Sequence, residues 1–178
     1  MKKIGIIVGS LRKDSFSGLV AKNLLTLLKG KADATIVDIS QLPLYNQDFD
    51  GGVLETPKAY TEFRQELKGF DSVIVVTPEH NRTMPAALKN VLDIGSRPWG
   101  HNLWAGKKAM IVGSSIGKLS AFGAVDEVRR VLAFLDAKIM NQPEVYLGPV
   151  QDLFDEDGVF VPGTLKFLGD VMDAFVAF

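Results

Sequence analysis

The sequence contains no cysteine. This absence excludes disulfide bonds, catalysis by a thiolate and metal sites with cysteine ligands. Histidine is scarce as well: the chain has two, His80 and His101, and neither stands in a cluster of carboxylates. Because a bound metal ion needs several such ligands brought together, we expect no metal site.

Long hydrophobic runs are also missing. No apolar stretch approaches the roughly 20 residues that a membrane-spanning helix needs, so we expect no membrane span. Lys2 and Lys3 precede a short apolar run, Ile4–Val8. This run is too short for the hydrophobic region of a signal peptide, and no small-residue cleavage site follows it. Since the lack of cysteine also suits a reducing compartment, we expect a cytoplasmic protein.

The chain has no excess of charge of either sign. It carries 20 Lys and Arg residues against 21 Asp and Glu residues, a formal net charge of −1. This balance gives no basic field for nucleic acid, and no strongly acidic face such as small electron-carrier proteins often show. With 178 residues, 47% of them hydrophobic, we expect one domain, residues 1–178, with a sizeable core.

Short apolar runs alternate with longer segments in which apolar residues recur at three-to-four spacing. The short runs predict five strands: Lys3–Val8, Ala34–Ile39, Ser72–Thr77, Lys108–Val112 and a weaker one at Lys138–Met140. The longer segments predict five helices: Phe16–Lys29, Glu55–Lys68, Ala86–Arg97, Phe122–Leu135 and Leu165–Phe178. Near-continuous apolar strands joined by crossover helices are typical of a parallel sheet covered on both faces, so the sequence predicts an α/β fold.

The loops after three of these strands are polar and marked by Gly or Pro. They are Ser10–Ser17, Pro78–Pro85 and Ser114–Leu119, which follow the first, third and fourth predicted strands. In doubly wound sheets, ligands bind outside the carboxyl ends of the strands, so we expect these loops to converge on one site. The long loop Ser40–Gly52 after the second strand is either a rim of that site or an interface arm.

The first of these loops has the composition of a phosphate site. At the start of the following helix, unpaired N–H groups and the positive end of the helix dipole favour an anion. Ser10, Ser15 and Ser17 add hydroxyl donors, and Arg12 adds a charged guanidinium with several N–H donors. Because Gly9 lacks the further glycines of the common dinucleotide and NTPase fingerprints, the loop suits a terminal phosphomonoester, and FMN is the obvious candidate. The alternative is that Ser15 and Ser17 only cap the helix and Arg12 is a solvated charge.

The second loop offers a surface for a planar ring. After Pro78, the backbone groups freed by the turn can bind the polar edge of an isoalloxazine, and Asn81 can fix the loop by side-chain bonds to backbone. We interpret Glu79 as a solvated carboxylate rather than a general acid. His80 could donate a proton, although a lone loop histidine is more often a packing or hydrogen-bonding residue.

The third loop, Ser114–Leu119, superficially resembles an NTPase phosphate loop but has the wrong spacing and no magnesium-binding hydroxyl. Ser115 offers a donor, and Gly117 permits close backbone approach to a flavin edge. The alternative is a plain turn from strand to helix. Further along, Trp99 and Trp104 could stack on a ligand, but we favour packing at a subunit contact, where aromatic residues are enriched.

The sequence resembles the NADPH-dependent FMN reductase family over nearly its whole length. Three segments carry the resemblance: Gly9–Ser17, similar to G-S-x-R-x-x-S-x-N; Pro78–Asn90, similar to P-E-Y-N-x-S-x-P-G-x-L-K-N; and Ser96–Pro98. Four departures stand out. Ser17 replaces the usual asparagine, His80 the common tyrosine and Ala86 a glycine, and Ala121-Phe122 stand where glycines often occur.

The resemblance implies a flavodoxin-like three-layer fold with a five-stranded parallel sheet of order 2-1-3-4-5. It also implies one FMN per subunit, NADPH or NADH as electron donor, and a homodimer or homotetramer. The acceptors would be small molecules: quinones, azo compounds, metal oxyanions or free flavin. The implied FMN residues are Ser10, Arg12, Ser15 and Ser17 at the phosphate, Pro78, Glu79, His80 and Asn81 along the ring, and Ser115 and Gly117 at its far edge.

Two other classes of protein stay open at this point. A flavodoxin-like electron carrier would bind FMN but would not turn over free NAD(P)H, and the weak net charge argues mildly against it. A non-flavin α/β protein, such as a phosphatase or a nucleotide-binding regulator, would purify colourless.

Overall fold

The computed structural model describes residues 1–178. Its strands are β1 (Lys3–Val8), β2 (Asp33–Val37), β3 (Ser72–Thr77), β4 (Lys108–Ser114), β5 (Lys138–Ile139) and β6 (Val145–Leu147). Its α-helices are α1 (Phe16–Leu27), α2 (Lys58–Gly69), α3 (Ala86–Gly95), α4 (Phe122–Phe134) and α5 (Pro162–Ala177), and two 3-10 helices span Gln47–Phe49 and Val150–Leu153. None of the helices combines the length and the apolar character that crossing a membrane requires.

The strands form one parallel sheet in the order β2-β1-β3-β4-β5, which confirms the predicted order. The sheet has six strands rather than the predicted five, because two short strands, β5 and β6, share the edge position beside β4. β5 pairs with the start of β4, and β6 pairs with its end at Val112, Gly113 and Ser114. Pro143 lies between the two pieces, and a proline has no N–H to donate to a ladder. The extra pairing extends β4 two residues beyond its predicted end, so Ser114 belongs to the strand.

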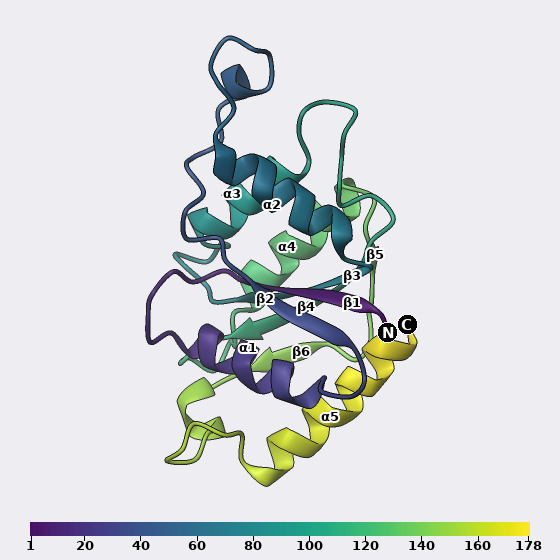
Figure 1. Ribbon diagram of the computed structural model, residues 1–178. Coiled ribbons are helices and arrows are strands. Elements are labelled where there is room, and N and C mark those ends of the chain that lie inside the picture. The colour runs from purple at the N-terminus through teal and green to yellow at the C-terminus, as the bar shows by residue number, and fades with distance from the viewer.

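Helices cover both faces of the sheet (Figure 1). One face packs against α2, α3 and α4 around residues such as Ile7, Val75 and Ile111. The other packs against α1 and α5 around Ile6 and other inward-pointing residues of the strands. Successive strand residues point to opposite faces, so near-continuous Ile and Val runs serve both cores at once.

The two tryptophans have different environments. Trp104 is fully buried in the core of its own chain, where its indole N–H donates to the Leu92 carbonyl at 3.0 Å. The prediction that Trp104 packs at a subunit contact is therefore wrong. The core between the sheet and α2, α3 and α4 has room for its ring beside Gly95, which has no side chain. Trp99 is 85% exposed, with Arg97 over its ring at 5.5 Å, and its place in a subunit contact stays a prediction.

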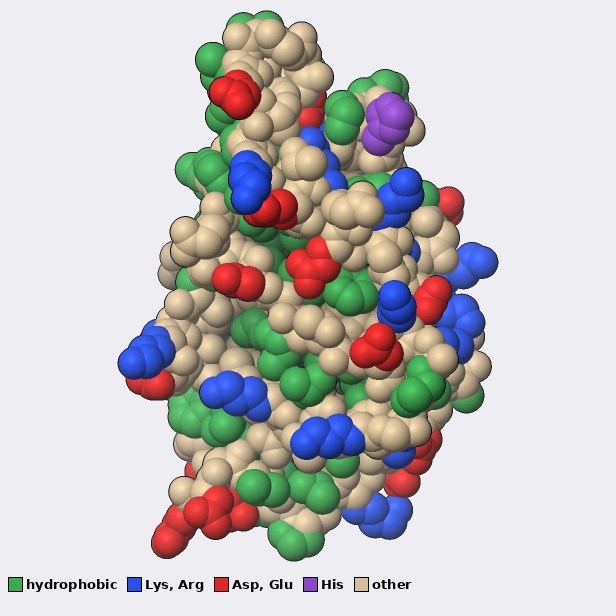
Figure 2. Space-filling view, in the orientation of Figure 1, with side chains coloured by type: hydrophobic (Ala, Val, Ile, Leu, Met, Phe, Trp, Pro, Cys, Tyr) green, Lys and Arg blue, Asp and Glu red, His purple; other side chains and the backbone are tan.

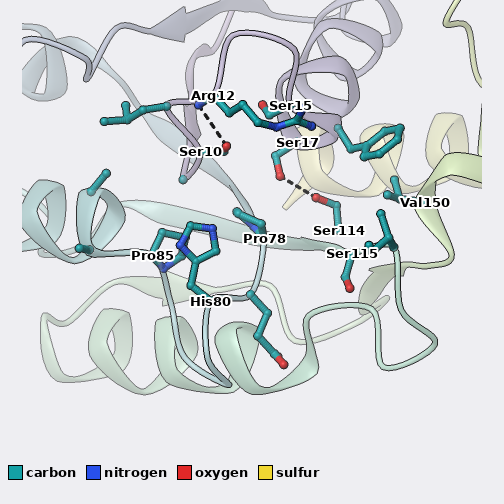
Figure 3. A pocket seen from close by; sticks show the side chains of 17 residues that line it. Ser10, Arg12, Ser15, Ser17, Pro78, His80, Pro85, Ser114, Ser115 and Val150 are labelled. Atoms are coloured by element: carbon teal, nitrogen blue, oxygen red, sulfur yellow. Dashed lines mark hydrogen bonds between the residues drawn. The ribbon is translucent and has the colours of Figure 1, made fainter.

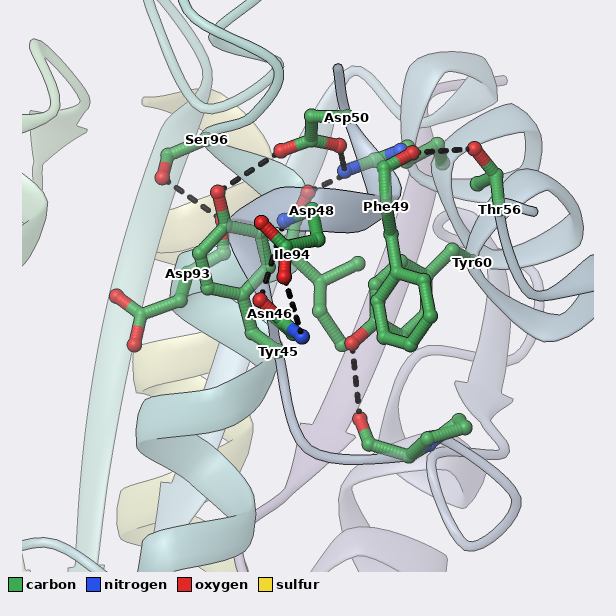
Figure 4. Close-up of polar contacts among 12 residues, drawn as sticks. Tyr45, Asn46, Asp48, Phe49, Asp50, Thr56, Tyr60, Asp93, Ile94 and Ser96 are labelled. Carbon is green, nitrogen blue, oxygen red and sulfur yellow. Dashed lines mark hydrogen bonds and ion pairs between the residues drawn. The ribbon is translucent and has the colours of Figure 1, made fainter. Parts of the chain in front are cut away.

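The long loop after β2 projects beyond the helices (Figure 1). The Tyr45 hydroxyl anchors it by donating to Asp50 at 2.8 Å (Figure 4). Arg64 of α2 contacts the other Asp50 oxygen at 2.8 Å. Asn90 of α3 accepts from the Tyr45 N–H at 2.8 Å. Burial, together with the bond to Asp50, raises the pKa of Tyr45 to about 12, so the hydroxyl remains a donor at neutral pH. Exposed Val53 lies beyond this anchored part.

Candidate functional site

A cavity of about 530 Å³ lies at the carboxyl edge of the sheet, where the loops after β1, β3 and β4 converge (Figure 3). This volume is in the range of sites for small molecules and cofactors. The lining residues are Gly9, Ser10, Leu11, Arg12, Ser15, Phe16, Ser17, Pro78, Glu79, His80, Pro85, Ala86, Ala87, Ser114, Ser115, Ile116 and Val150. Eight of the ten residues expected at the FMN site are therefore brought together, and Asn81 and Gly117 are not among them.

The loop after β1 presents hydrogen-bond donors to the cavity. Ser15 is the N-cap of α1, and its hydroxyl oxygen accepts from the Gly18 N–H at 3.0 Å. The capping alternative thus holds for Ser15, but the hydroxyl keeps its own proton for a ligand. The N–H groups of Phe16 and Ser17 have no partner within the chain. The start of α1 accordingly has free donors as well as the positive end of its dipole.

Ser17 does not cap the helix. It is buried, and its hydroxyl is 2.8 Å from the hydroxyl of Ser114 at the end of β4 (Figure 3). One hydroxyl donates in this pair, which leaves the other proton free for a ligand. Ser114 was not among the predicted site residues, although a hydroxyl at the end of a strand that leads into a polar loop was a usable signal.

Arg12 is the unpaired cation of the cavity. Its side chain forms no ion pair with any carboxylate of the chain. The backbone N–H of Arg12 donates to the Ser10 hydroxyl oxygen at 3.4 Å, which helps to shape the loop. Free N–H groups, hydroxyls with available protons and an uncommitted guanidinium form a donor set that suits a phosphate dianion. The residues present therefore fit the phosphate end of FMN.

The loop after β3 is a tight hairpin. His80 and Thr83 exchange two backbone hydrogen bonds, of 2.9 and 3.0 Å, around Asn81 and Arg82, whose φ angles are 51° and 67°. Two successive positive φ values define a type I′ turn. Asn81 suits this conformation, but its side chain forms no hydrogen bond in the chain, so the prediction that it fixes the loop by side-chain bonds is wrong. Its role in the turn is conformational.

Glu79 docks this hairpin on α4. Its side chain is 11% exposed, and one oxygen accepts from the Ala124 N–H at 3.2 Å in the first turn of the helix. The other oxygen is 3.2 Å from the Arg82 guanidinium. The interpretation of Glu79 as a solvated carboxylate is therefore wrong. The start of α4 has no side-chain cap of its own, and a carboxylate from a neighbouring loop stabilises both its N–H groups and its dipole.

Glu127, which lies on α4, contacts the other side of the hairpin. Its carboxylate accepts one hydrogen bond from the Thr83 hydroxyl and another, of 3.2 Å, from the Met84 N–H. These two bonds hold the pKa of Glu127 below its ordinary value. No local pattern distinguishes this glutamate from other charged helix residues, because its partners lie about 43 positions earlier in the chain.

Replacing Glu127 with glutamine should reduce stability at neutral pH by about 1 kcal/mol, since hydrogen bonds to a charged acceptor are stronger than those to a neutral one. A depressed native pKa stabilises the fold above the unfolded-state value, roughly pH 4.3, and this contribution is lost as the pH falls through the native pKa. The difference between wild type and Glu127→Gln in urea unfolding should therefore shrink below about pH 4. A difference that is independent of pH would contradict the role of the carboxylate charge.

Arg82 is a non-glycine residue in the left-handed region, at φ 67°. Its exposed ion pair with Glu79 contributes little. We therefore expect Arg82→Gly to be more stable than Arg82→Ala by about 1 kcal/mol, because both lose the ion pair but only glycine relieves the strain. Urea unfolding of the two variants measures this difference. An alanine variant as stable as the glycine variant would show that the turn is not strained.

The loop after β4 contributes Ser115, whose hydroxyl oxygen accepts from the Gly117 N–H at 3.0 Å. Gly117 itself has ordinary room for a side chain. The crowded glycine is Gly148 after β6, where a Cβ atom would lie 2.5 Å from the Ser120 hydroxyl and 2.6 Å from the Gly117 carbonyl oxygen. The Val150 N–H then donates to the Ser115 carbonyl at 2.9 Å, which brings Val150 into the cavity wall. This segment was not predicted to contribute to the site, because β6 itself was not predicted.

The fold and the cavity define the class: this is a flavodoxin-like, three-layer α/β protein with a ligand cavity at the carboxyl edge of its parallel sheet. Residues 2–152 match the family model of NADPH-dependent FMN reductase. The chain belongs to the NADPH-dependent FMN reductase family.

Individual relatives support the same assignment. The chain is 42% identical over 174 residues to a quinone reductase of Pseudomonas putida, an alignment that spans 98% of this chain and 92% of that protein. It is also 42% identical to a 2-hydroxy-1,4-benzoquinone reductase of Burkholderia sp., over 98% of this chain and 94% of that protein. Among solved structures, the flavoenzyme NAD(P)H:(acceptor) oxidoreductase FerB of Paracoccus denitrificans aligns with a TM-score of 0.92 at 33% identity, covering 99% of this chain and 96% of that one.

The resemblance inferred from the three sequence segments is thus confirmed. The protein is an oxidoreductase of a family that uses FMN and NAD(P)H. The face of the molecule in Figure 2 shows basic and acidic side chains interspersed.

Proposed function

We propose that this protein holds FMN in the cavity at the carboxyl edge of its sheet and uses NAD(P)H to reduce quinones. The observation that carries the proposal is the arrangement of the cavity: the free donors of the loop after β1 lie across from the hairpin that begins at Pro78. One wall suits a phosphate and the other a planar ring. The quinone reductases of Pseudomonas putida and Burkholderia sp. support the choice of acceptor.

Each wall has a distinct task in this proposal. The phosphate is held by Arg12, by the hydroxyls of Ser10 and Ser15, by the spare proton of the Ser17–Ser114 pair, and by the N–H groups at the start of α1. Pro78, Glu79 and His80 line the ring through their backbone, while Asn81 shapes the turn. Ser115 lies at the far edge of the ring, and its hydroxyl oxygen accepts from the Gly117 N–H.

FMN supplies the redox chemistry when bound, because it accepts a hydride from NAD(P)H and passes the electrons to an acceptor. The chain supplies position and electrostatics. Two contacts between the hairpin and α4, from Glu79 of the loop to Ala124 and from Glu127 of α4 to Met84, hold the hairpin in one geometry. Backbone N–H groups of the hairpin that face the ring would stabilise negative charge that develops there. Azo compounds, metal oxyanions and free flavin are further acceptors in this proposal.

The proposal also includes a single-domain chain, a homodimer or homotetramer, and a cytoplasmic location. The exposed loop around Val53 and the exposed Trp99 support the oligomer, since exposed apolar side chains are found where subunits meet. The lack of cysteine supports the location.

The test is spectroscopic. The purified protein is titrated with FMN, NADPH is added without oxygen, and then 1,4-benzoquinone is added. Bleaching of the bound flavin by NADPH and return of its colour with the quinone are the expected results. Bound flavin that NADPH does not bleach would identify an electron carrier instead, and a protein that binds no flavin would overturn the proposed site.

A further inference from the structure

Proton supply to the cavity is limited to a few side chains. The titratable residues that line it are Arg12, Glu79 and His80. A guanidinium stays protonated in proteins and cannot serve as an acid. The Glu79 carboxylate is committed to the Ala124 N–H and to Arg82. His80 is therefore the one lining side chain left that can act as a general acid.

The backbone of His80 is fixed, but its ring is free. Its N–H and carbonyl are both bonded to Thr83 across the turn, at 2.9 and 3.0 Å. No hydrogen bond engages either ring nitrogen within the chain. Figure 3 shows the ring directed into the cavity between Pro78 and Pro85. A ring nitrogen is consequently available to a molecule bound there.

A second cavity, of about 590 Å³, lies on the other side of the hairpin, and His80 and Ala86 line both cavities. His80 is itself exposed to solvent, which gives the ring a route to regain a proton. Its charged lining residues are Lys89, Glu127 and Arg130. Each has an opposite charge nearby: Lys89 lies 2.6 Å from Asp93, and Glu127 lies 3.6 Å from Arg130.

We propose that His80 donates a proton to the acceptor during its reduction. This inference rests on the proposed quinone reductase function. Reduction of a quinone to a hydroquinone takes two electrons and two protons. The hydride that the reductase reaction supplies carries both electrons and one of the protons. The ring N–H bond of His80 breaks as an O–H bond forms on the second quinone oxygen, and the neutral ring then takes a proton from water.

The experiment compares two acceptors. Ferricyanide takes one electron and no proton, whereas 1,4-benzoquinone needs the proton. For wild type and His80→Gln, the rate with the quinone is divided by the rate with ferricyanide, which removes any effect on flavin binding or reduction by NADPH. We expect His80→Gln to lower this ratio by about 100-fold, a typical contribution of a general acid. His101→Gln, which changes the other histidine of the chain, is the matched control and should keep the ratio.

A second measurement does not depend on turnover. In the oxidised FMN-loaded protein, the ring proton signals of the two histidines are assigned by comparison with His101→Gln. Addition of 1,4-benzoquinone should shift the NMR signal of His80 and leave that of His101 in place. An unchanged rate ratio in His80→Gln would overturn the role of His80 while leaving the quinone reductase function intact. A wild-type protein that reduces ferricyanide but no quinone would overturn both.

Discussion

Replacing Arg12 with alanine is expected to weaken FMN binding by roughly 10- to 150-fold, the equivalent of about 1.5–3 kcal/mol for a hydrogen bond to a charged group. Arg12 is exposed, lines the cavity and has no carboxylate partner in the chain. Its removal therefore deletes a ligand contact without leaving a buried charge unpaired. Quenching of flavin fluorescence on titration with the apoprotein measures the affinity.

Two controls make this result specific. Lys13→Ala removes the neighbouring exposed cation, which does not line the cavity, and should leave the affinity for FMN nearly unchanged. Riboflavin lacks the phosphate, so wild type and Arg12→Ala should bind it equally. Equal FMN affinity in Arg12→Ala and wild type would show that the phosphate is not held by the loop after β1.

Replacing Gly123 with alanine should disrupt the hairpin after β3. Alanine in a helix is ordinarily more stable than glycine, by roughly 0.5–1 kcal/mol. At this position, however, a Cβ atom would lie 2.8 Å from the Arg82 carbonyl oxygen and 3.0 Å from a Glu79 carboxylate oxygen. The first is backbone and cannot turn away, so the hairpin has to move off α4. We expect a net loss of stability of about 1–3 kcal/mol, typical of overpacking, and weaker FMN binding.

Gly169→Ala is the matched control, because Gly169 lies in α5 with no atom within 4 Å of its added Cβ. That variant should gain roughly 0.5–1 kcal/mol and bind FMN as wild type does. Urea unfolding and FMN titration of the two variants separate the intrinsic helix preference from the contact with the hairpin. If Gly123→Ala behaved like Gly169→Ala in both measurements, close packing of α4 against the hairpin would not position the ring-binding wall.

The features that depend on short-range patterns could be predicted from the sequence. Apolar runs such as Ser72–Thr77, alternating with amphipathic segments, specify strands and crossover helices, because each element must bury its apolar side. The donors around Ser15 could also be predicted, because they belong to one strand, one loop and the first turn of one helix. The sheet order and FMN came with the resemblance, which three short segments carried.

The way in which these elements are held together depends on contacts that form only in the folded chain. The Ser17–Ser114 hydroxyl pair joins residues 97 positions apart, and the contacts of Glu79 and Glu127 with α4 and the hairpin join residues more than 40 positions apart. No local periodicity encodes such pairs, because either partner alone reads as an ordinary polar surface residue. The same holds for Trp104, whose burial depended on space beside Gly95. The local chemistry of the site was therefore readable in the sequence, whereas its geometry came from packing between distant elements.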